Sequence, residues 1–252
     1  MLTSVRNLLL ATTFAGAVFA AVPAAAQDAT TGEVTTGEVT VSANAAIVSE
    51  YRFRGVDYSG GDIAVQGGID VAHSSGIYFG TWGSSLDEDT VGYGHTELDL
   101  FGGWSGEVSP GVSLDVGGIY YIYPNAPEGD YDYVEAYASA GFTFGPGDVS
   151  VGIAYAPEQA SLGDQDNIYV FGDVGVGIPN TPVTLAAHAG YTDGYNTYTN
   201  DGQAWDWSVG ADYALSENVS VGGAYVGAEG DYAPGAYNFT DDTVVFSLSA
   251  SF

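Results

Sequence analysis

Charged side chains recur on one face of alternating stretches of this chain. In ELDLFGG, for example, Leu98 and Leu100 share one face while Glu97 and Asp99 share the other. This period of two is typical of β-strands. The candidate pore-lining residues on the polar faces are Arg52, Arg54, Asp70, Glu97, Asp99, Asp115, Glu135, Asp173, His188, Asp206 and Asp212. Carboxylates predominate in this set, and rings of Asp and Glu attract cations when a low-dielectric wall surrounds them.

Two arginines are the basic members of that set, and both follow the first alternating stretch. Arg52 and Arg54 are expected near the outer end of the first strand, where they could face the acids and form a constriction. They could equally neutralise buried acids inside a filled interior, because small barrels are often filled by side chains. Both interpretations remain open at this stage.

Catalytic arrangements are weakly represented. His73 is followed by two serines, but a serine nucleophile needs a histidine in hydrogen-bond reach at an accessible site, and we expect this turn on the opposite side from such a site. His95 is expected near Glu88 and Asp89, which leaves a hydrolase as an alternative. The alternation predicts that His188 is an inward-facing polar residue. No helix follows the GxG stretches, so they are not phosphate loops, and no catalytic residue is predicted.

The charge of the chain limits its partners. It has 32 acidic residues and three basic ones over 252 positions, and the three are all arginines. Such a chain repels phosphates, which argues against a nucleic-acid partner. The stretch LDEDT holds three consecutive carboxylates, and hard oxygen ligands suit Ca²⁺ and Mg²⁺. No calcium-loop pattern is present, so a solvated acidic surface is the preferred interpretation, and neither a metal nor a cofactor is predicted.

The elements that would position these side chains are all strands. Gly and Tyr are abundant at 37 and 19 residues, and there is no Cys. Alternation predicts an all-β fold with strands over residues 39–53, 64–73, 77–84, 95–105, 112–122, 132–144, 148–155, 167–178, 183–191, 204–213, 218–227 and 242–252. Most have the length of about 9–11 residues that a tilted membrane-spanning strand needs.

The connections between these strands alternate in length. Brief ones such as SSG and GPG follow every second strand, and longer ones such as SLDEDTVGYG follow the others. An outer-membrane barrel has short periplasmic turns, longer extracellular loops and an even strand count. The pattern therefore predicts a transmembrane antiparallel up-and-down β-barrel of about 12 strands.

Aromatic residues mark both expected rims of this barrel. At the outer rim we expect outward Phe53, Tyr120, Tyr155, Tyr191, Tyr225, Trp205 and Trp207. At the other rim we expect Trp104, Phe142, Tyr213 and Phe252. Aromatic rings favour both membrane–water interfaces. The chain ends on VVFSLSASF, and a last strand that alternates up to Phe252 is suited to close the barrel and to act as a membrane-insertion signature.

The first residues predict export. A positive residue, an apolar run and small residues before Gln27 are typical of a secretory signal peptide over residues 1–26. Residues 27–38 repeat TGEV and predict a flexible acidic lead-in, and residues 39–252 form the predicted barrel. The expected location is the bacterial outer membrane.

Several stretches resemble a known family. SEYRFRG, QGGIDVAHSSGIYFGTWGS, ELDLFGGWSGE, DVGGIYYIYPNA and YDYVEAYASAGF are similar to the TorF-type family of proposed outer-membrane porins. The similarity extends from about Ser42 to Phe252 and is strongest before Phe144. It implies an outer-membrane barrel with a pore role, and it implies no substrate and no catalytic residues.

The sequence thus predicts a porin for passive diffusion of small solutes, with a preference for cations. A barrel filled by side chains, with a structural or adhesive role carried by acidic extracellular loops, is the first alternative, and an outer-membrane hydrolase is the second. The expected partners are outer-membrane lipid, lipopolysaccharide, small solutes and the outer-membrane assembly machinery. Monomeric and oligomeric forms both remain open.

Overall fold

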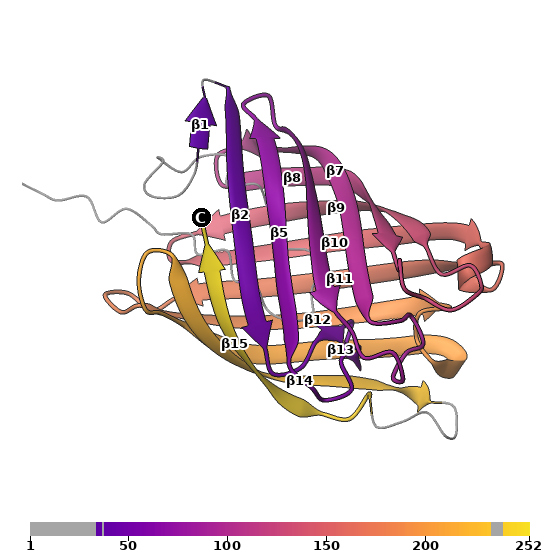
Figure 1. The fold of residues 1–252 in the computed structure, drawn as a ribbon. Coiled ribbons are helices and arrows are strands. Elements are labelled where there is room, and N and C mark those ends of the chain that lie inside the picture. Colours follow the sequence, from indigo (N-terminus) through magenta and orange to yellow (C-terminus); the bar gives the residue numbers. More distant parts are fainter. Residues whose placement is uncertain (1–33, 37, 233–238) are drawn as a thin grey trace, which may run out of the picture.

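The computed structural model describes residues 34–36, 38–232 and 239–252, and strands make up most of them (Figure 1). The strands of the wall are β2 (Val39–Val48), β5 (Ala64–His73), β6 (Ile77–Ser85), β7 (Thr96–Ser109), β8 (Val112–Ile122), β9 (Tyr133–Phe144), β10 (Gly147–Gln159), β11 (Gln165–Gly177), β12 (Val183–Gly194), β13 (Thr199–Ala214), β14 (Val219–Tyr232) and β15 (Thr243–Ser251). Three shorter strands accompany them: β1 (Val34–Thr36), β3 (Arg52–Phe53) and β4 (Val56–Asp57). A single 3-10 turn, η1 (Ala160–Leu162), is described.

The twelve wall strands form one closed ring. Each pairs antiparallel with its sequence neighbour, and β2 pairs with both β5 and β15. The register at the closure matches Ser247 with Val48 and Ser251 with Asn44. Closure pairs the edge of the first wall strand with that of the last, as a barrel in lipid requires. The predicted up-and-down barrel is therefore confirmed.

The last residue takes part in this closure. The backbone N–H of Phe252 donates to the carbonyl oxygen of Ala43 at 2.8 Å, and the N–H of Ala43 donates back to Phe252 at 2.9 Å. The ring of Phe252 itself is exposed on the surface. The alternation of the final strand thus continues to the last residue because that residue still pairs with β2.

The wall separates an apolar outer face from a polar inner one. On β15, Phe246 is 63% exposed whereas the neighbouring Val245 is 3% exposed and faces the interior. The same alternation exposes Leu98 and Leu100 while Glu97 and Asp99 are buried inside. A barrel whose outside is apolar and whose inside carries the acids is the inverse of a water-soluble barrel, and it suits a lipid surround.

The predicted aromatic rims are largely present on that outer face. Exposed rings include Tyr120, Tyr155, Tyr225 and Trp205 toward the ends of the strands that meet the longer loops, and Trp104, Phe142, Tyr213 and Phe252 toward the other end. Below, the two ends of the barrel are called the long-loop end and the short-turn end. Phe53 is the exception, because it is 3% exposed and lies inside the barrel.

The first predicted strand, 39–53, is wrong beyond Val48. After Ser49 the chain turns into the interior, where β3 and β4 pair as a small hairpin with Arg52 opposite Asp57 and Phe53 opposite Val56. The two residues between these strands both have positive φ, 48° at Arg54 and 79° at Gly55. Such a two-residue turn fits a tight hairpin. A hairpin alternates like the strand that it interrupts, so the alternation alone could not reveal it.

The remaining boundaries follow the predictions closely, with extensions mostly at the long-loop end. The strand predicted over 95–105 is instead extended at the short-turn end, where it continues to Ser109. The strand predicted over 148–155 continues to Gln159, and those predicted over 183–191 and 204–213 meet across a connection of residues 195–198. Irregular register between Ala156 and Gln159 accompanies one extension. Parts of the predicted long loops are therefore strand, and the wall projects further on this side.

The N-terminal predictions fall mostly on residues that are not described. The predicted signal peptide, 1–26, and the first part of the predicted lead-in lie outside the described residues. Where flexible chain was predicted, β1 forms a short strand that pairs Val34 with Val41 on β2. In the part of the chain that the structure describes, no helix is long and apolar enough to cross a membrane.

Candidate functional site: the barrel lumen

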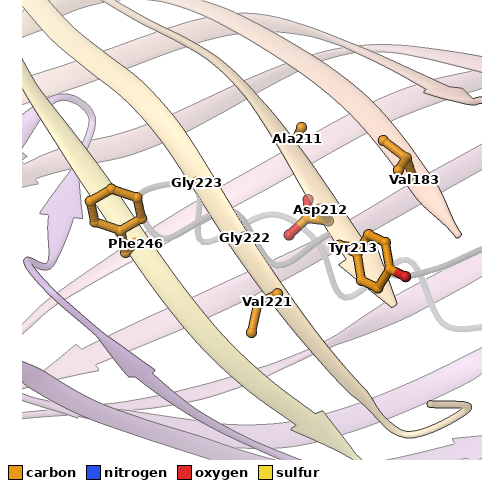
Figure 2. Close-up of a pocket in the computed structure, with 8 residues that line it drawn as sticks. All are labelled: Val183, Ala211, Asp212, Tyr213, Val221, Gly222, Gly223 and Phe246. Atoms are coloured by element: carbon orange, nitrogen blue, oxygen red, sulfur yellow. The ribbon is translucent and has the colours of Figure 1, made fainter. Parts of the chain in front are cut away.

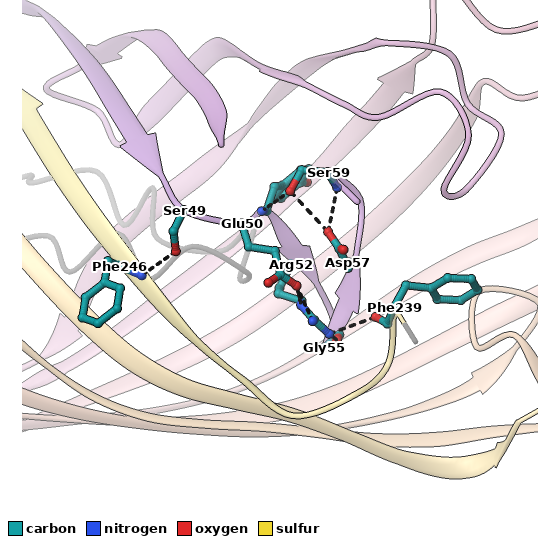
Figure 3. A network of polar contacts seen from close by, with 9 residues as sticks. Ser49, Glu50, Arg52, Gly55, Asp57, Ser59, Phe239 and Phe246 are labelled. Atoms are coloured by element: carbon teal, nitrogen blue, oxygen red, sulfur yellow. Dashed lines mark hydrogen bonds and ion pairs between the residues drawn. The ribbon is translucent and has the colours of Figure 1, made fainter. Parts of the chain in front are cut away.

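Segment 49–63, here called the lumen hairpin, enters the barrel from the long-loop end and contains β3 and β4 (Figure 3). Every residue from Glu50 to Ser59 is buried. Arg52 holds the segment together, because its Nη1 donates to the carbonyl oxygens of Gly55 and Phe239, each at 2.9 Å, and it forms a close ion pair with Glu50. Burial raises the pKa of the Glu50 carboxyl, and the Arg52 guanidinium acts in the opposite direction.

A second set of bonds closes the base of the lumen hairpin. The Asp57 carboxylate accepts the backbone N–H of Ser59 at 2.8 Å, and the Ser59 hydroxyl accepts the N–H of Tyr51, also at 2.8 Å. The backbone of Asp57 donates to Phe239 at 2.7 Å, which ties the hairpin to the loop before β15. These local bonds give the hairpin a defined shape of its own.

The tip of the lumen hairpin reaches the far wall. Nη2 of Arg54 donates to Oε2 of Glu135 on β9 at 2.7 Å, and its guanidinium carbon lies 4.2 Å from the centre of the Tyr169 ring on β11. Gly55 fits so tightly that a Cβ there would lie 2.7 Å from Ala228 on β14. In the ring order, β9 and β11 are each five strands from β2, in opposite directions. The hairpin therefore crosses the lumen.

Aromatic rings fill the space around the lumen hairpin. Tyr51 and Tyr58 of the hairpin pack edge to face at 5.6 Å, and Tyr58 packs similarly on Tyr93 at 5.7 Å. On the wall, Tyr121 and Tyr133 stack at 4.4 Å. Burial raises the pKa of Tyr93 to about 12, which keeps this loop residue neutral. The long-loop half of the lumen is thus packed rather than open.

Three predicted residues come together on adjacent strands opposite the hairpin. His188 lies between two carboxylates, with Nδ1 2.7 Å from Asp173 Oδ1 and Nε2 2.9 Å from Asp206 Oδ1. Tyr169 donates its hydroxyl to the same Asp206 oxygen at 3.1 Å. The Tyr169 hydroxyl also lies 2.8 Å from Nε2 of His188, so the histidine, the two carboxylates and the tyrosine form one polar cluster. The sequence analysis placed His188 inward but identified neither of these two carboxylates as its partner.

Glu97 and Asp99 are buried side by side on β7 beneath the lumen hairpin. Glu97 accepts a long hydrogen bond of 3.4 Å from the Tyr123 hydroxyl. Neither carboxylate oxygen of Asp99 has a hydrogen-bond partner among the described residues. Arg54 bonds to Glu135 instead, and Arg52 bonds to Glu50, to Gly55 and to Phe239 in the loop before β15. Of the acids predicted on the wall, Glu135 is therefore the one that forms an ion pair with an arginine among the described residues.

The short-turn half of the lumen is lined differently. Its inward positions include Asp70, Asp115 and Asp212 together with many Gly and Ser residues. The Tyr78 hydroxyl donates to Asp115 at 2.6 Å. Among the described residues, no ion pair joins these three acids to a basic side chain. Because the inward side chains here are small and no described segment crosses between them, we call this the wider half, and its lining is net acidic.

Inward aromatic rings in the middle of the barrel lie against neighbouring glycines. The ring of Phe101 covers Gly80, and the ring of Phe171 covers Gly152, so closely that a Cβ at either glycine would overlap the ring. Tyr137 covers its own neighbouring glycine in the same way. Because glycine has no side chain, these rings lie along the wall instead of projecting across the lumen.

Several functional residues were not among the sequence candidates. Glu50, Tyr121 and Tyr169 contact the predicted arginines or acids. The sequence did not single out the two tyrosines, because tyrosine occurs on both faces of these strands. One signal for the hairpin was present: a glycine directly after Arg54, which permits a tight turn.

The histidines at the two ends of the barrel contact neighbouring polar side chains. Nδ1 of His73 lies 2.8 Å from the Ser75 hydroxyl and also accepts the Ser75 backbone N–H, while Nε2 lies 3.1 Å from Glu38. These exposed residues cap a turn at the short-turn end. His95 contacts the hydroxyl of Thr96 at 3.0 Å. The prediction of no catalytic residue stays a prediction.

The acidic loops do not assemble a metal cluster within the described ranges. No group of three or more His, Cys, Asp or Glu side chains there has the geometry to hold an ion. In the LDEDT stretch, Asp87 accepts hydrogen bonds from the Asp89 backbone and the Thr90 hydroxyl. That carboxylate shapes its own loop.

A hollow of about 340 Å³ lies in the wall, away from the lumen hairpin (Figure 2). Its lining is mostly apolar and includes the exposed Tyr213 and Phe246, and its polar member is Asp212. Gly222 and Gly223 leave the strand without side chains at this point. The hollow therefore lies on the apolar outer face of the wall.

Comparison with known proteins agrees with this architecture. Residues 32–252 match the family model Gcw_chp, described as a bacterial protein of unknown function. The chain belongs to this family. Comparison with curated proteins finds no match.

Solved structures of small porins share the fold of this Gcw_chp protein. The NanC porin in a rhombohedral crystal form has a TM-score of 0.55 and 11% identity, covering 84% of this chain and 97% of that one. The KdgM porin has a TM-score of 0.55 and 8% identity, covering 84% and 98%. A KdgM porin in complex with disordered oligogalacturonate has a TM-score of 0.53 and 8% identity, covering 84% and 97%. At these identities the likeness is one of fold.

Proposed function

We propose that this protein is a porin-like channel of the bacterial outer membrane, through which small solutes diffuse passively with a preference for cations. One observation carries the proposal: a closed barrel with an apolar outer face surrounds a lumen whose lining is acidic. Glu97 and Asp99 lie in the narrower long-loop half, where solvent screens a charge least. Asp70, Asp115 and Asp212 line the wider half. Among the described residues, no ion pair joins any of these acids to a basic side chain. Acidic rings within a low-dielectric wall concentrate cations.

The location follows from the same proposal. The predicted signal peptide would export the chain, and the exposed aromatic rims would lie at the two interfaces of a bilayer with lipid and lipopolysaccharide. Phe252, which pairs with β2 at the closure, is our candidate for the signal that the assembly machinery reads. The resemblance to the TorF-type family supports this role. The short-turn end would face the periplasm and the long-loop end the outside.

A filled barrel with a structural or adhesive role is the second candidate, and the lumen hairpin favours it. The hairpin crosses the lumen, and Arg54 contacts the far wall. If the hairpin stays in this position, the route through the long-loop half is narrow. A channel then requires either a gap beside the hairpin or its displacement.

Recording from planar bilayers across a KCl gradient separates the two candidates. The mature protein, refolded and verified by its heat-dependent gel shift, should produce discrete openings with a reversal potential toward that of potassium. Chloride preference would keep the channel but overturn the role of the acids. A silent bilayer with folded protein would favour the filled barrel.

Charge-neutralising variants test the cation preference. The triple variant Glu97→Gln, Asp99→Asn and Glu135→Gln should move the reversal potential toward zero. Asp87→Asn is the matched control, because Asp87 lies in a loop and bonds within it. An equal shift in both variants would mean that overall surface charge, rather than the lumen, sets the preference.

A further inference from the structure

Two wall residues form a site that suits a cation, and the chain's own Arg54 lies in it. Glu135 on β9 accepts a hydrogen bond of 2.7 Å from the guanidinium, and the face of Tyr169 on β11 lies 4.2 Å from the guanidinium carbon. Phe53 of the hairpin lies 4.9 Å away on its own side. A carboxylate and an aromatic face together attract planar organic cations, because the ring's quadrupole presents negative charge on its face.

The wall holds both of these groups without help from Arg54. The Tyr169 hydroxyl donates to Asp206, which in turn contacts His188 at 2.9 Å. The Tyr121 hydroxyl donates to the same Glu135 oxygen at 3.2 Å. Glycine at position 190 leaves room for the Tyr169 hydroxyl, since a Cβ there would overlap it. The site is therefore built into the barrel wall, whereas Arg54 is delivered to it by a loop segment.

The contact with Arg54 is incomplete on the arginine side. Nε and Nη1 of Arg54 have no hydrogen-bond partner among the described residues, and Oε1 of Glu135 has none either. Arginine often binds a carboxylate through two parallel bonds, and here only one forms. The backbone at Arg54 also has a φ of 48°, a region that non-glycine residues seldom occupy. A free guanidinium-type cation has no backbone attachment, so it can orient to form both hydrogen bonds without a strained φ angle.

We propose that Glu135 and Tyr169 form a binding site for guanidinium-type organic cations, and that Arg54 occupies this site as a tethered competitor. Removal of the Arg54 side chain would free the tip of the lumen hairpin and widen the long-loop half of the lumen, and a free cation bound in its place would narrow that passage again. A weakly hydrated planar cation stacks on an aromatic face more readily than an alkali ion does. The test by bilayer recording rests on the proposed channel function, whereas the test by thermal unfolding does not.

Chemical rescue of Arg54→Ala tests the site with methylguanidinium chloride as the probe. The variant should conduct more than the wild type, and methylguanidinium should reduce its current. At ten times a millimolar dissociation constant, occupancy reaches about 90%, so the blockable current should fall about tenfold. Methylammonium chloride at equal concentration should have a much smaller effect, because it lacks the planar fork. Adding Glu135→Gln to Arg54→Ala should abolish the block.

Arg52→Ala is the matched control. Arg52 contacts Glu50 and two backbone carbonyls, and it makes no bond to the far wall. Its loss should loosen the hairpin while Arg54 still occupies the site, so methylguanidinium should block this variant much less than Arg54→Ala. Equal block of both variants would overturn the proposal. If Arg54→Ala does not refold, Arg54→Gln removes the charge while keeping most of the side-chain volume.

Thermal unfolding in detergent distinguishes failure of the site from failure of the channel. Methylguanidinium should raise the unfolding temperature of the Arg54 variant but not that of the double variant with Glu135→Gln. This result in a protein that is silent in bilayers would support the site and reject the channel. A conducting Arg54 variant whose current and unfolding temperature both ignore methylguanidinium would reject the site and keep the channel.

Discussion

The two halves of the lumen use the same strands in opposite ways. At the long-loop end, the inward residues are large, among them Tyr121, Tyr133 and Tyr169, and the lumen hairpin packs between them. At the short-turn end, the inward residues are mostly Gly, Ser and Asp, with no described segment crossing between them. The strand count and the alternation are common to both halves, so the size of the inward side chains sets the difference.

The comparison extends to charge. In the long-loop half, Arg54 contacts an acid of the wall and Arg52 contacts an acid of the hairpin. In the short-turn half, the three acids Asp70, Asp115 and Asp212 lack basic partners among the described residues. Arginines of the chain therefore neutralise part of the charge in the long-loop half. In the wider half, neutralisation of the acids would require cations from solution.

Removing the lumen hairpin should give the largest effect. Replacing residues 50–60 by a short Gly-Ser linker should raise single-channel conductance about tenfold, because a barrel of this size leaves little space once a segment crosses it. The measurement is planar-bilayer recording of refolded protein. Unchanged conductance would mean that the short-turn half, rather than the hairpin, limits passage.

Breaking the contact between hairpin and wall should lower stability. Glu135→Ala leaves the Arg54 charge buried without its partner, which should cost about 3 kcal/mol of unfolding free energy. Urea titration of the protein in lipid vesicles measures this quantity. The double variant Arg54→Ala/Glu135→Ala should be less destabilised than the sum of its single variants. Simple additivity would show that the two side chains contribute independently.

Two glycines on adjacent strands test whether the Phe171 ring in the middle of the barrel needs the space that a neighbouring glycine leaves. Gly152→Ala places a methyl group against the Phe171 ring and should cost about 1–3 kcal/mol, as overpacking does, or push the ring into the lumen and lower the conductance. Gly175→Ala on the adjacent strand is the matched control, because nothing lies within 4 Å of the added Cβ. Equal effects from both substitutions would contradict the view that the ring needs its glycine.

Neutralising acids of the short-turn half should give the smallest effect. Asp70→Asn together with Asp212→Asn should reduce the cation preference by a few millivolts of reversal potential without changing stability much, since solvent screens exposed charges. Recording at low salt should enlarge the shift. A shift as large as that of the Glu97, Asp99 and Glu135 triple variant would assign selectivity to the wider half.

Much of the barrel could be predicted because period-two alternation depends only on local sequence. The strands at 64–73 and 112–122 have the predicted bounds, and inward Glu97 and Asp99 were identified from apolar neighbours. The first strand was extended wrongly to Phe53, because a two-residue turn preserves alternation. His188 was recognised as inward, yet its partners Asp173 and Asp206 lie on two other strands. Cross-strand register is not encoded in any one stretch.

The sequence by itself determined that strands of this length alternate, that one face is apolar and the other acidic, and that turns alternate in length. Those properties depend only on residues that are close in the sequence, so they can be predicted without knowledge of the tertiary structure. Only the tertiary structure decided that segment 49–63 turns inward and that Arg54 meets Glu135 across the lumen. Residues 81 positions apart in sequence become neighbours there because closure of the barrel brings β9 opposite β2.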